Sequence, residues 1–182
     1  MNTTGVVNLI ILIAVISAQL LIMAMPGVGI FIKASDAIGV IALLSAIRYA
    51  FTGYKKAGAT FYKIFMLLFA ASEVVSLIGL FAGNEYTGSS VTVIKFLTIV
   101  SIAAMLVLTF WKDLGKKKTL AISSLILALY CIMMILCLRQ AIGSGVLVSV
   151  TVIRLLQKIM MAVIACMIAQ AKYVDKEERG RE

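Results

Sequence analysis

Residues 61–82 read FYKIFMLLFAASEVVSLIGLFA, a run of 22 residues in which Lys63 and Glu73 are the only charged side chains. As an α-helix this run extends for about 33 Å, enough to cross the roughly 30 Å hydrocarbon core of a bilayer. The whole chain has the same character, because 63% of its 182 residues are hydrophobic, 14% are charged and one is proline. Soluble domains carry about a quarter charged residues. The sequence therefore predicts an integral membrane protein.

Five further apolar runs resemble the first in length, and the connections between them are short. We predict an all-α fold with six transmembrane helices in a single transmembrane domain, residues 1–182. The predicted spans are about 5–25, 36–54, 61–82, 91–111, 119–140 and 146–172. The first is a retained helix rather than a signal peptide, because no basic segment precedes it, and it ends at Pro26-Gly27.

The basic residues predict the orientation of the helices, because Lys and Arg in short loops stay on the cytoplasmic side. Twelve of the 17 fall on one side of a six-span arrangement: Arg48, Lys55, Lys56, Lys63, Lys112, Lys116, Lys117, Lys118, Lys172, Lys176, Arg179 and Arg181. Both termini are therefore predicted to be cytoplasmic. Lys33 and Asp36, Asn84-Glu85 and Arg139 then lie at the external ends.

A short repeat indicates how the helices are arranged. Residues 91–95 read VTVIK and residues 150–154 read VTVIR, 59 positions later. Both segments open a helix that runs from outside to inside in the predicted topology. The spacing favours three pseudo-repeated helical hairpins of about 60 residues each, and a chance match of apolar residues is the alternative.

Ionisable residues far from both membrane surfaces are the most informative, because each is costly in the bilayer and seldom persists without a partner or a watery cavity. Glu73 lies in the middle of the third span and Lys158 in the middle of the sixth. We therefore predict a Glu73–Lys158 ion pair between these helices. Gln19 and Gln157 are the expected hydrogen-bonding neighbours.

Arg154 lies four residues before Lys158, so both cations share one helix face. One carboxylate cannot neutralise two cations, and this favours an outward-facing cationic site for an anionic or zwitterionic ligand. Arg154 and Lys158 would form this site and Glu73 would tune it. Lys95 and Arg139 would lie at its rim. The alternative is structural: Glu73 neutralises Lys158 and the other bases reach the outer headgroups.

The composition also excludes several kinds of chemistry. There is no histidine, so histidine metal sites, haem ligation by histidine and histidine-based triads are absent. Cys131, Cys137 and Cys166 lie in apolar runs without CxxC spacing and are predicted to be buried and reduced. We expect no catalytic residue, metal or cofactor and no enzymatic activity. The net charge of +9 is expected to contact anionic lipid at the cytoplasmic face rather than nucleic acid.

Six spans with both termini inside and almost no loops resemble the substrate-binding membrane subunits of energy-coupling-factor transporters in size and topology. Ala14-xxx-Ala18 is similar to the alanine motif with which those subunits pack against their transmembrane partner. We therefore expect a multi-pass protein of the bacterial cytoplasmic membrane that binds or transports a small anionic or amphiphilic solute. The alternative is a non-catalytic accessory or immunity subunit that packs against a partner membrane protein.

Overall fold

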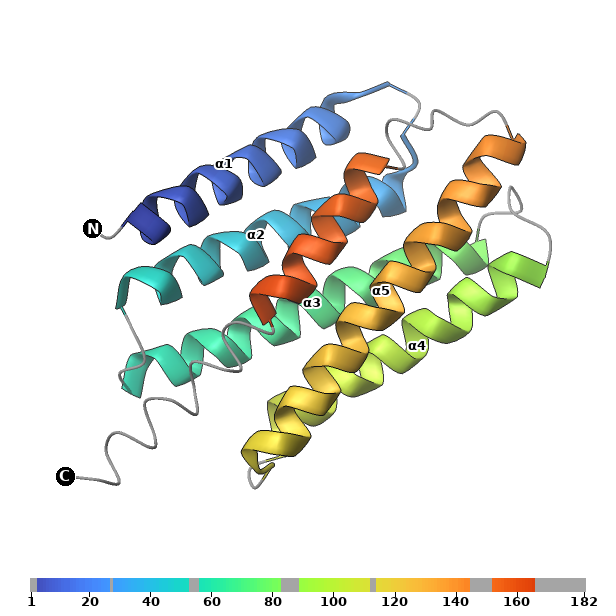
Figure 1. Ribbon diagram of the computed structural model, residues 1–182. Coiled ribbons are helices and arrows are strands. Elements are labelled where there is room, and N and C mark those ends of the chain that lie inside the picture. Colours follow the sequence, from blue (N-terminus) through green and yellow to red (C-terminus); the bar gives the residue numbers. More distant parts are fainter. Residues whose placement is uncertain are drawn as a thin grey trace.

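The computed structural model describes residues 3–26, 28–52, 56–82, 89–111, 114–144 and 152–165, and all of its regular structure there is helical. The labelled helices are α1 (Thr3–Ala24), α2 (Ile30–Thr52), α3 (Lys56–Ala82), α4 (Ser89–Phe110) and α5 (Lys116–Ser144). A sixth helix, residues 152–165, is the orange-red segment without a label in Figure 1. We call it the final helix.

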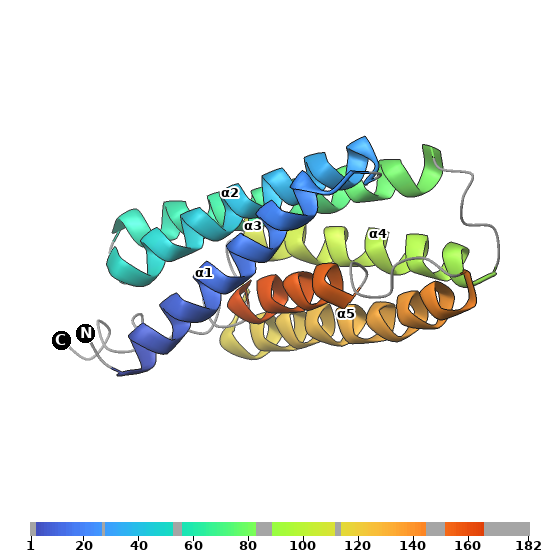
Figure 2. The same cartoon turned by 90° about the horizontal axis from the view of Figure 1, so that it is seen from above.

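Consecutive helices run in opposite directions and form an up-and-down bundle (Figure 1). Each of the first five helices packs against its neighbour in the chain, and the α2–α3 contact is the most extensive. The final helix lies between α1 and α5, across α2 and α3, and a perpendicular view shows the same placement (Figure 2). It therefore lies beside helices from the beginning, middle and end of the chain.

The outer surface of the bundle is apolar. Isoleucine, leucine and phenylalanine side chains are exposed on every helix whose side chains are described, among them Leu21, Ile41, Phe81, Phe96 and Ile135. Three segments are long and apolar enough to cross a membrane, namely Lys63–Ala82, Ser90–Phe110 and Lys117–Ile142. A surface of this kind needs lipid around it, so the predicted helical membrane protein is supported.

The core of the bundle is built around α3. Phe65, Met66 and Phe69 are fully buried there, and the Phe69 ring stacks on Tyr130 of α5 with 5.6 Å between ring centroids. Where α2 and α3 cross, Gly79 has no side chain and Phe31 occupies the space, since a Cβ atom at position 79 would lie 2.8 Å from the Phe31 Cβ atom. Small residues let membrane helices approach closely in this way.

The beginning of α2 differs from the prediction. α1 ends at Ala24, two residues before the proline, and the Gly29 carbonyl then accepts hydrogen bonds from the amides of Ile32 and Lys33. These bonds start α2 at Ile30, six residues before the predicted start of the second span at Asp36. Asp36 therefore lies more than one turn inside the helix, and its predicted place at the external end of the span is wrong.

Candidate functional site

Four ionisable side chains from three helices meet inside the bundle. Asp36 comes from α2, Glu73 from α3, and Arg154 and Lys158 from the final helix. We call these four residues the charge cluster. The two cations lie one turn apart on one helix face, and each of them meets a different carboxylate. The described cluster therefore holds two positive and two negative side chains.

The Glu73–Lys158 ion pair predicted from the sequence is confirmed. The Lys158 Nζ atom donates a hydrogen bond to the Glu73 Oε1 atom. Glu73 is buried in the middle of the apolar segment Lys63–Ala82. In such surroundings an unpaired charge is costly, so each member of this pair stabilises the other.

The Arg154–Asp36 pair was not predicted. The Arg154 Nε atom lies 3.4 Å from the Asp36 Oδ2 atom, but these two atoms do not have hydrogen-bonding geometry. The Asp36 side chain is 2% exposed, whereas that of Arg154 is 19% exposed. Asp36 thus neutralises the second cation, and the excess positive charge expected beside Glu73 is absent from the described cluster.

Two serines fix the depth of the two carboxylates. Ser35 and Ser72, each next to one acid in the chain, are buried and face each other across α2 and α3. Each hydroxyl donates to the other residue's backbone carbonyl at 2.9 Å, and the two Oγ atoms are 3.0 Å apart. This contact places Asp36 at the depth of Glu73. The recurring pair Ser-Asp and Ser-Glu is a sequence signal that could have identified Asp36.

We expect Ser35→Ala and Ser72→Ala each to lower the free energy of unfolding by about 0.6 kcal/mol, the average for hydrogen bonds between membrane helices. The double variant should lose less than the sum, because the two hydroxyls share their bonds. Ser101→Ala is the matched control: Ser101 is also buried, and its hydroxyl has no partner in the described part of the chain. Unfolding in mixed detergent micelles measures all four changes, and an equal loss for Ser101→Ala would contradict this role of the serines.

Two glutamines extend the polar region toward α1. Gln19 and Gln157 are both buried, and among the described side chains the Gln19 Oε1 and Gln157 Nε2 atoms have no hydrogen-bond partner. The Gln19 amide lies against Gly39, one turn beyond Asp36, where a Cβ atom would be 3.0 Å from its Nε2 atom and 3.7 Å from the Met161 Sδ atom. Gly39 thus leaves room for a glutamine beside the cluster.

The opposite side of the cluster is formed by α5. Tyr130 is buried against Phe69, and its hydroxyl interacts electrostatically with the Glu73 carboxylate. Cys137, two turns further along α5, lies within the electrostatic reach of Arg154 and Lys158. The charge cluster therefore lies among α2, α3, α5 and the final helix, with Gln19 of α1 against Gly39 of α2.

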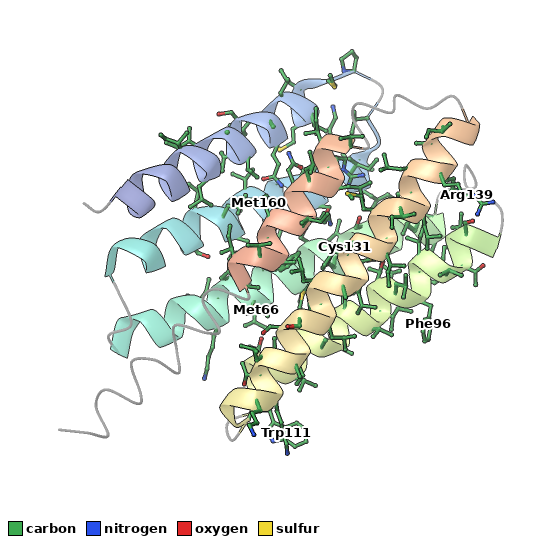
Figure 3. The ribbon with its side chains drawn as sticks, in the orientation of Figure 1. Met66, Phe96, Trp111, Cys131, Arg139 and Met160 are labelled. Atoms are coloured by element: carbon green, nitrogen blue, oxygen red, sulfur yellow. The ribbon has the colours of Figure 1, made fainter. Side chains whose placement is uncertain are left out.

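Two predicted rim residues lie elsewhere. The Lys95 Nζ atom lies 4.4 Å from the centre of the Phe81 ring, a cation–π contact between α4 and α3. Arg139 is exposed on α5 and lies at the edge of the bundle (Figure 3). The structure thus brings together Glu73, Arg154 and Lys158, with Gln19 nearby, and places Lys95 and Arg139 outside the cluster.

The cysteines are less buried than expected. Cys131 is exposed on α5 (Figure 3) and Cys137 is half-buried, so the prediction of burial is wrong for Cys131, which lies on the apolar outer face. Cys166 lies outside the described residues. In the part of the chain that the structure describes, no three Cys, Asp or Glu side chains gather as metal ligands would.

Comparison of the chain with protein-family models, with curated proteins and with solved structures gives no match. The arrangement of the charge cluster is therefore the basis for any functional interpretation. Chemically, its guanidinium can hold a carboxylate or phosphate through two parallel hydrogen bonds, and its carboxylates can hold a cation or accept a proton.

Proposed function

We propose that this protein is a multi-pass membrane protein that binds or transports a small charged solute at the charge cluster. Arg154 is the anchor for the anionic group of the solute. Ionisable residues within membrane segments commonly mark solute or ion pathways. The guanidinium is suited to this role because its planar donors match a carboxylate or phosphate.

The observation that carries this proposal is the set of buried polar atoms that lack a hydrogen-bond partner. Among the described residues these include the Gln19 Oε1, Asp36 Oδ2, Arg154 Nε and Gln157 Nε2 atoms. Unsatisfied groups of this kind are rare in folded proteins and often indicate a missing ligand or water. The Arg154 Nε and Asp36 Oδ2 atoms face each other as an ion pair without a hydrogen bond. A polar solute between α1, α2 and the final helix would give hydrogen bonds to these two atoms and to the two glutamine atoms.

The Arg154–Asp36 pair is the part of the cluster that a solute can enter. Lys158 and Glu73 are joined by a hydrogen bond, whereas the Arg154 Nε and Asp36 Oδ2 atoms do not have hydrogen-bonding geometry and the Arg154 side chain is 19% exposed. Arg154 also lies one turn closer than Lys158 to the end of the bundle where α2 and the final helix begin. An anionic group arriving from that end meets Arg154 first and competes with Asp36 for it.

The same end is the external one in the topology that we propose. Lys63, Lys117 and Lys118 are exposed near the opposite end, where α3 and α5 begin, and the basic-residue rule puts that end in the cytoplasm, facing anionic lipid. Six spans, both termini inside and a bacterial cytoplasmic membrane complete this topology. The solute site then opens outward.

A non-catalytic accessory subunit is the second candidate. The observation in its favour is charge balance: with Asp36 opposite Arg154 and Glu73 opposite Lys158, the four charges can serve only to hold the final helix in place. The protein would then act by packing against a partner membrane protein. Solute binding distinguishes the two candidates.

The proposal predicts that small carboxylates or phosphates stabilise the purified protein and that Arg154→Gln weakens this effect at least about tenfold, the loss expected for a hydrogen bond to a charged group. Thermal unfolding in detergent at several concentrations of each compound measures the affinity. Arg139→Gln is the matched control and should bind as the wild type does, because Arg139 lies outside the cluster.

The solute-binding proposal fails if no compound stabilises the wild type, or if Arg154→Gln binds as well as Arg139→Gln does. Circular dichroism of each variant shows that it is folded. Stable co-purification with another membrane protein in the absence of any solute effect would instead favour the accessory role.

A further inference from the structure

We infer that the solute is a compact zwitterion, with its carboxylate on Arg154 and its ammonium group on Asp36. This inference rests on the proposed function and names the class of solute. It follows from the net charge of the cluster before and after binding.

The charge cluster itself is neutral, with Asp36 opposite Arg154 and Glu73 opposite Lys158. A simple anion at Arg154 would leave three negative charges and two positive ones, and a simple cation at Asp36 would leave the reverse. Either excess charge would lie at the depth of Glu73, in the middle of an apolar span, where an uncompensated charge is disfavoured. A zwitterion keeps the sum at zero.

The geometry also limits the size of the zwitterion. The Arg154 Nε atom and the Asp36 Oδ2 atom are 3.4 Å apart. A solute that replaces this ion pair with two new ones, carboxylate to Arg154 and ammonium to Asp36, must therefore carry its two charges close together. The adjacent amino and carboxylate groups of a 2-amino acid have this spacing. The Gln19 Oε1 and Gln157 Nε2 atoms, an acceptor and a donor without described partners, can bind the remaining polar hydrogens and oxygens.

The test compares three probe sets with matched carbon skeletons: common 2-amino acids, the carboxylates that lack the amino group, and the amines that lack the carboxylate. Isothermal calorimetry on the purified protein measures each affinity. We expect at least one amino acid to bind the wild type, and its matched carboxylate and amine to bind roughly 100-fold more weakly, the ratio that one uncompensated charge in a membrane span implies.

Asp36→Asn removes one negative charge without changing the shape of the side chain. In this variant the occupied site is neutral with a simple carboxylate, so the preference for the amino acid should fall below about tenfold. Arg139→Gln, outside the cluster, should keep the full preference. If Asp36→Asn does not fold, calorimetry of the wild type in two buffers of different ionisation enthalpy replaces it. A zwitterion should then bind without net proton uptake.

The outcomes separate the two proposals. The zwitterion inference is overturned if the wild type binds a matched carboxylate with an affinity within threefold of that for the amino acid, or if amino acid binding takes up a proton. In either case the proposed site would still stand if binding is weaker in Arg154→Gln. Amino acid binding that is unchanged in Arg154→Gln overturns both proposals. Failure of every amino acid to bind overturns the inference, and the carboxylate and phosphate series then decides the proposed function separately.

Discussion

Lys158→Met is expected to lower the free energy of unfolding by about 3 kcal/mol. The substitution keeps an unbranched side chain, shorter by one atom, and removes the ammonium group that donates to Glu73. Glu73 is 3% exposed, so its carboxylate would be left without a cation in apolar surroundings. Breaking a buried ion pair by removing one member is strongly destabilising. Reversible unfolding in mixed micelles measures the change.

A double variant shows whether the loss belongs to the pair. Glu73→Leu combined with Lys158→Met removes both charges, and an apolar pair in the same place is expected to restore stability to within about 1 kcal/mol of the wild type. Lys95→Met is the matched control, because Lys95 contacts only the Phe81 ring among the interactions described for it, and a cation–π contact contributes about 0.5–1 kcal/mol. Equal losses for the two methionine variants, or no recovery in the double variant, would contradict this account.

The Arg154–Asp36 pair should respond asymmetrically. Arg154→Met leaves Asp36 buried without its cation, and we expect a loss of about 3 kcal/mol. Asp36→Leu leaves a guanidinium that is 19% exposed and can extend toward the membrane surface, so about 1–2 kcal/mol should be lost. The double variant with both substitutions should recover most of the stability. Equal effects of the two single variants, measured by the same unfolding titration, would show that exposure does not govern this pair.

The sequence was sufficient to predict the Glu73–Lys158 contact because depth within a span can be counted along the chain. Glu73 and Lys158 each lie near the middle of an apolar run, and in a chain with few charges they stand out. The small residues that follow on the same helix face, Ala162 and Ala165, are buried. The depth of each residue in its span was therefore enough to predict one of the two ion pairs.

Asp36 could not be identified in the same way, because its depth depends on where α2 begins. Lys33 and Asp36 together resemble the polar end of a helix, and the three apolar residues before them, 30–32, are too few to indicate a helical turn by themselves. The hydrogen bonds accepted by Gly29 start the helix there and carry Asp36 inward. A shift of six residues converts a surface acid into the partner of Arg154.

Lys95 and Arg139 show the other limit of sequence reasoning. Their depth was compatible with a place near the site, but depth does not fix the direction in which a helix face points. The similar segments 91–95 and 150–154 illustrate this, since Lys95 and Arg154 are the last residues of the two segments, yet Lys95 contacts Phe81 and Arg154 contacts Asp36. The rotation of each helix about its own axis decides which residues face the site, and packing across the whole bundle determines that rotation.

The most direct test of the account is the distance between Arg154 and Asp36 in a lipid bilayer. Solid-state NMR with ¹⁵N in the arginine guanidinium groups and ¹³C in the aspartate carboxyl groups reports close contacts between them. We expect a strong dipolar contact between Arg154 and Asp36, in keeping with the 3.4 Å between their Nε and Oδ2 atoms, and the loss of this contact in Asp36→Asn. Absence of this contact in the wild type, or its persistence in Asp36→Asn, would contradict a charge-balanced cluster of two ion pairs within the membrane.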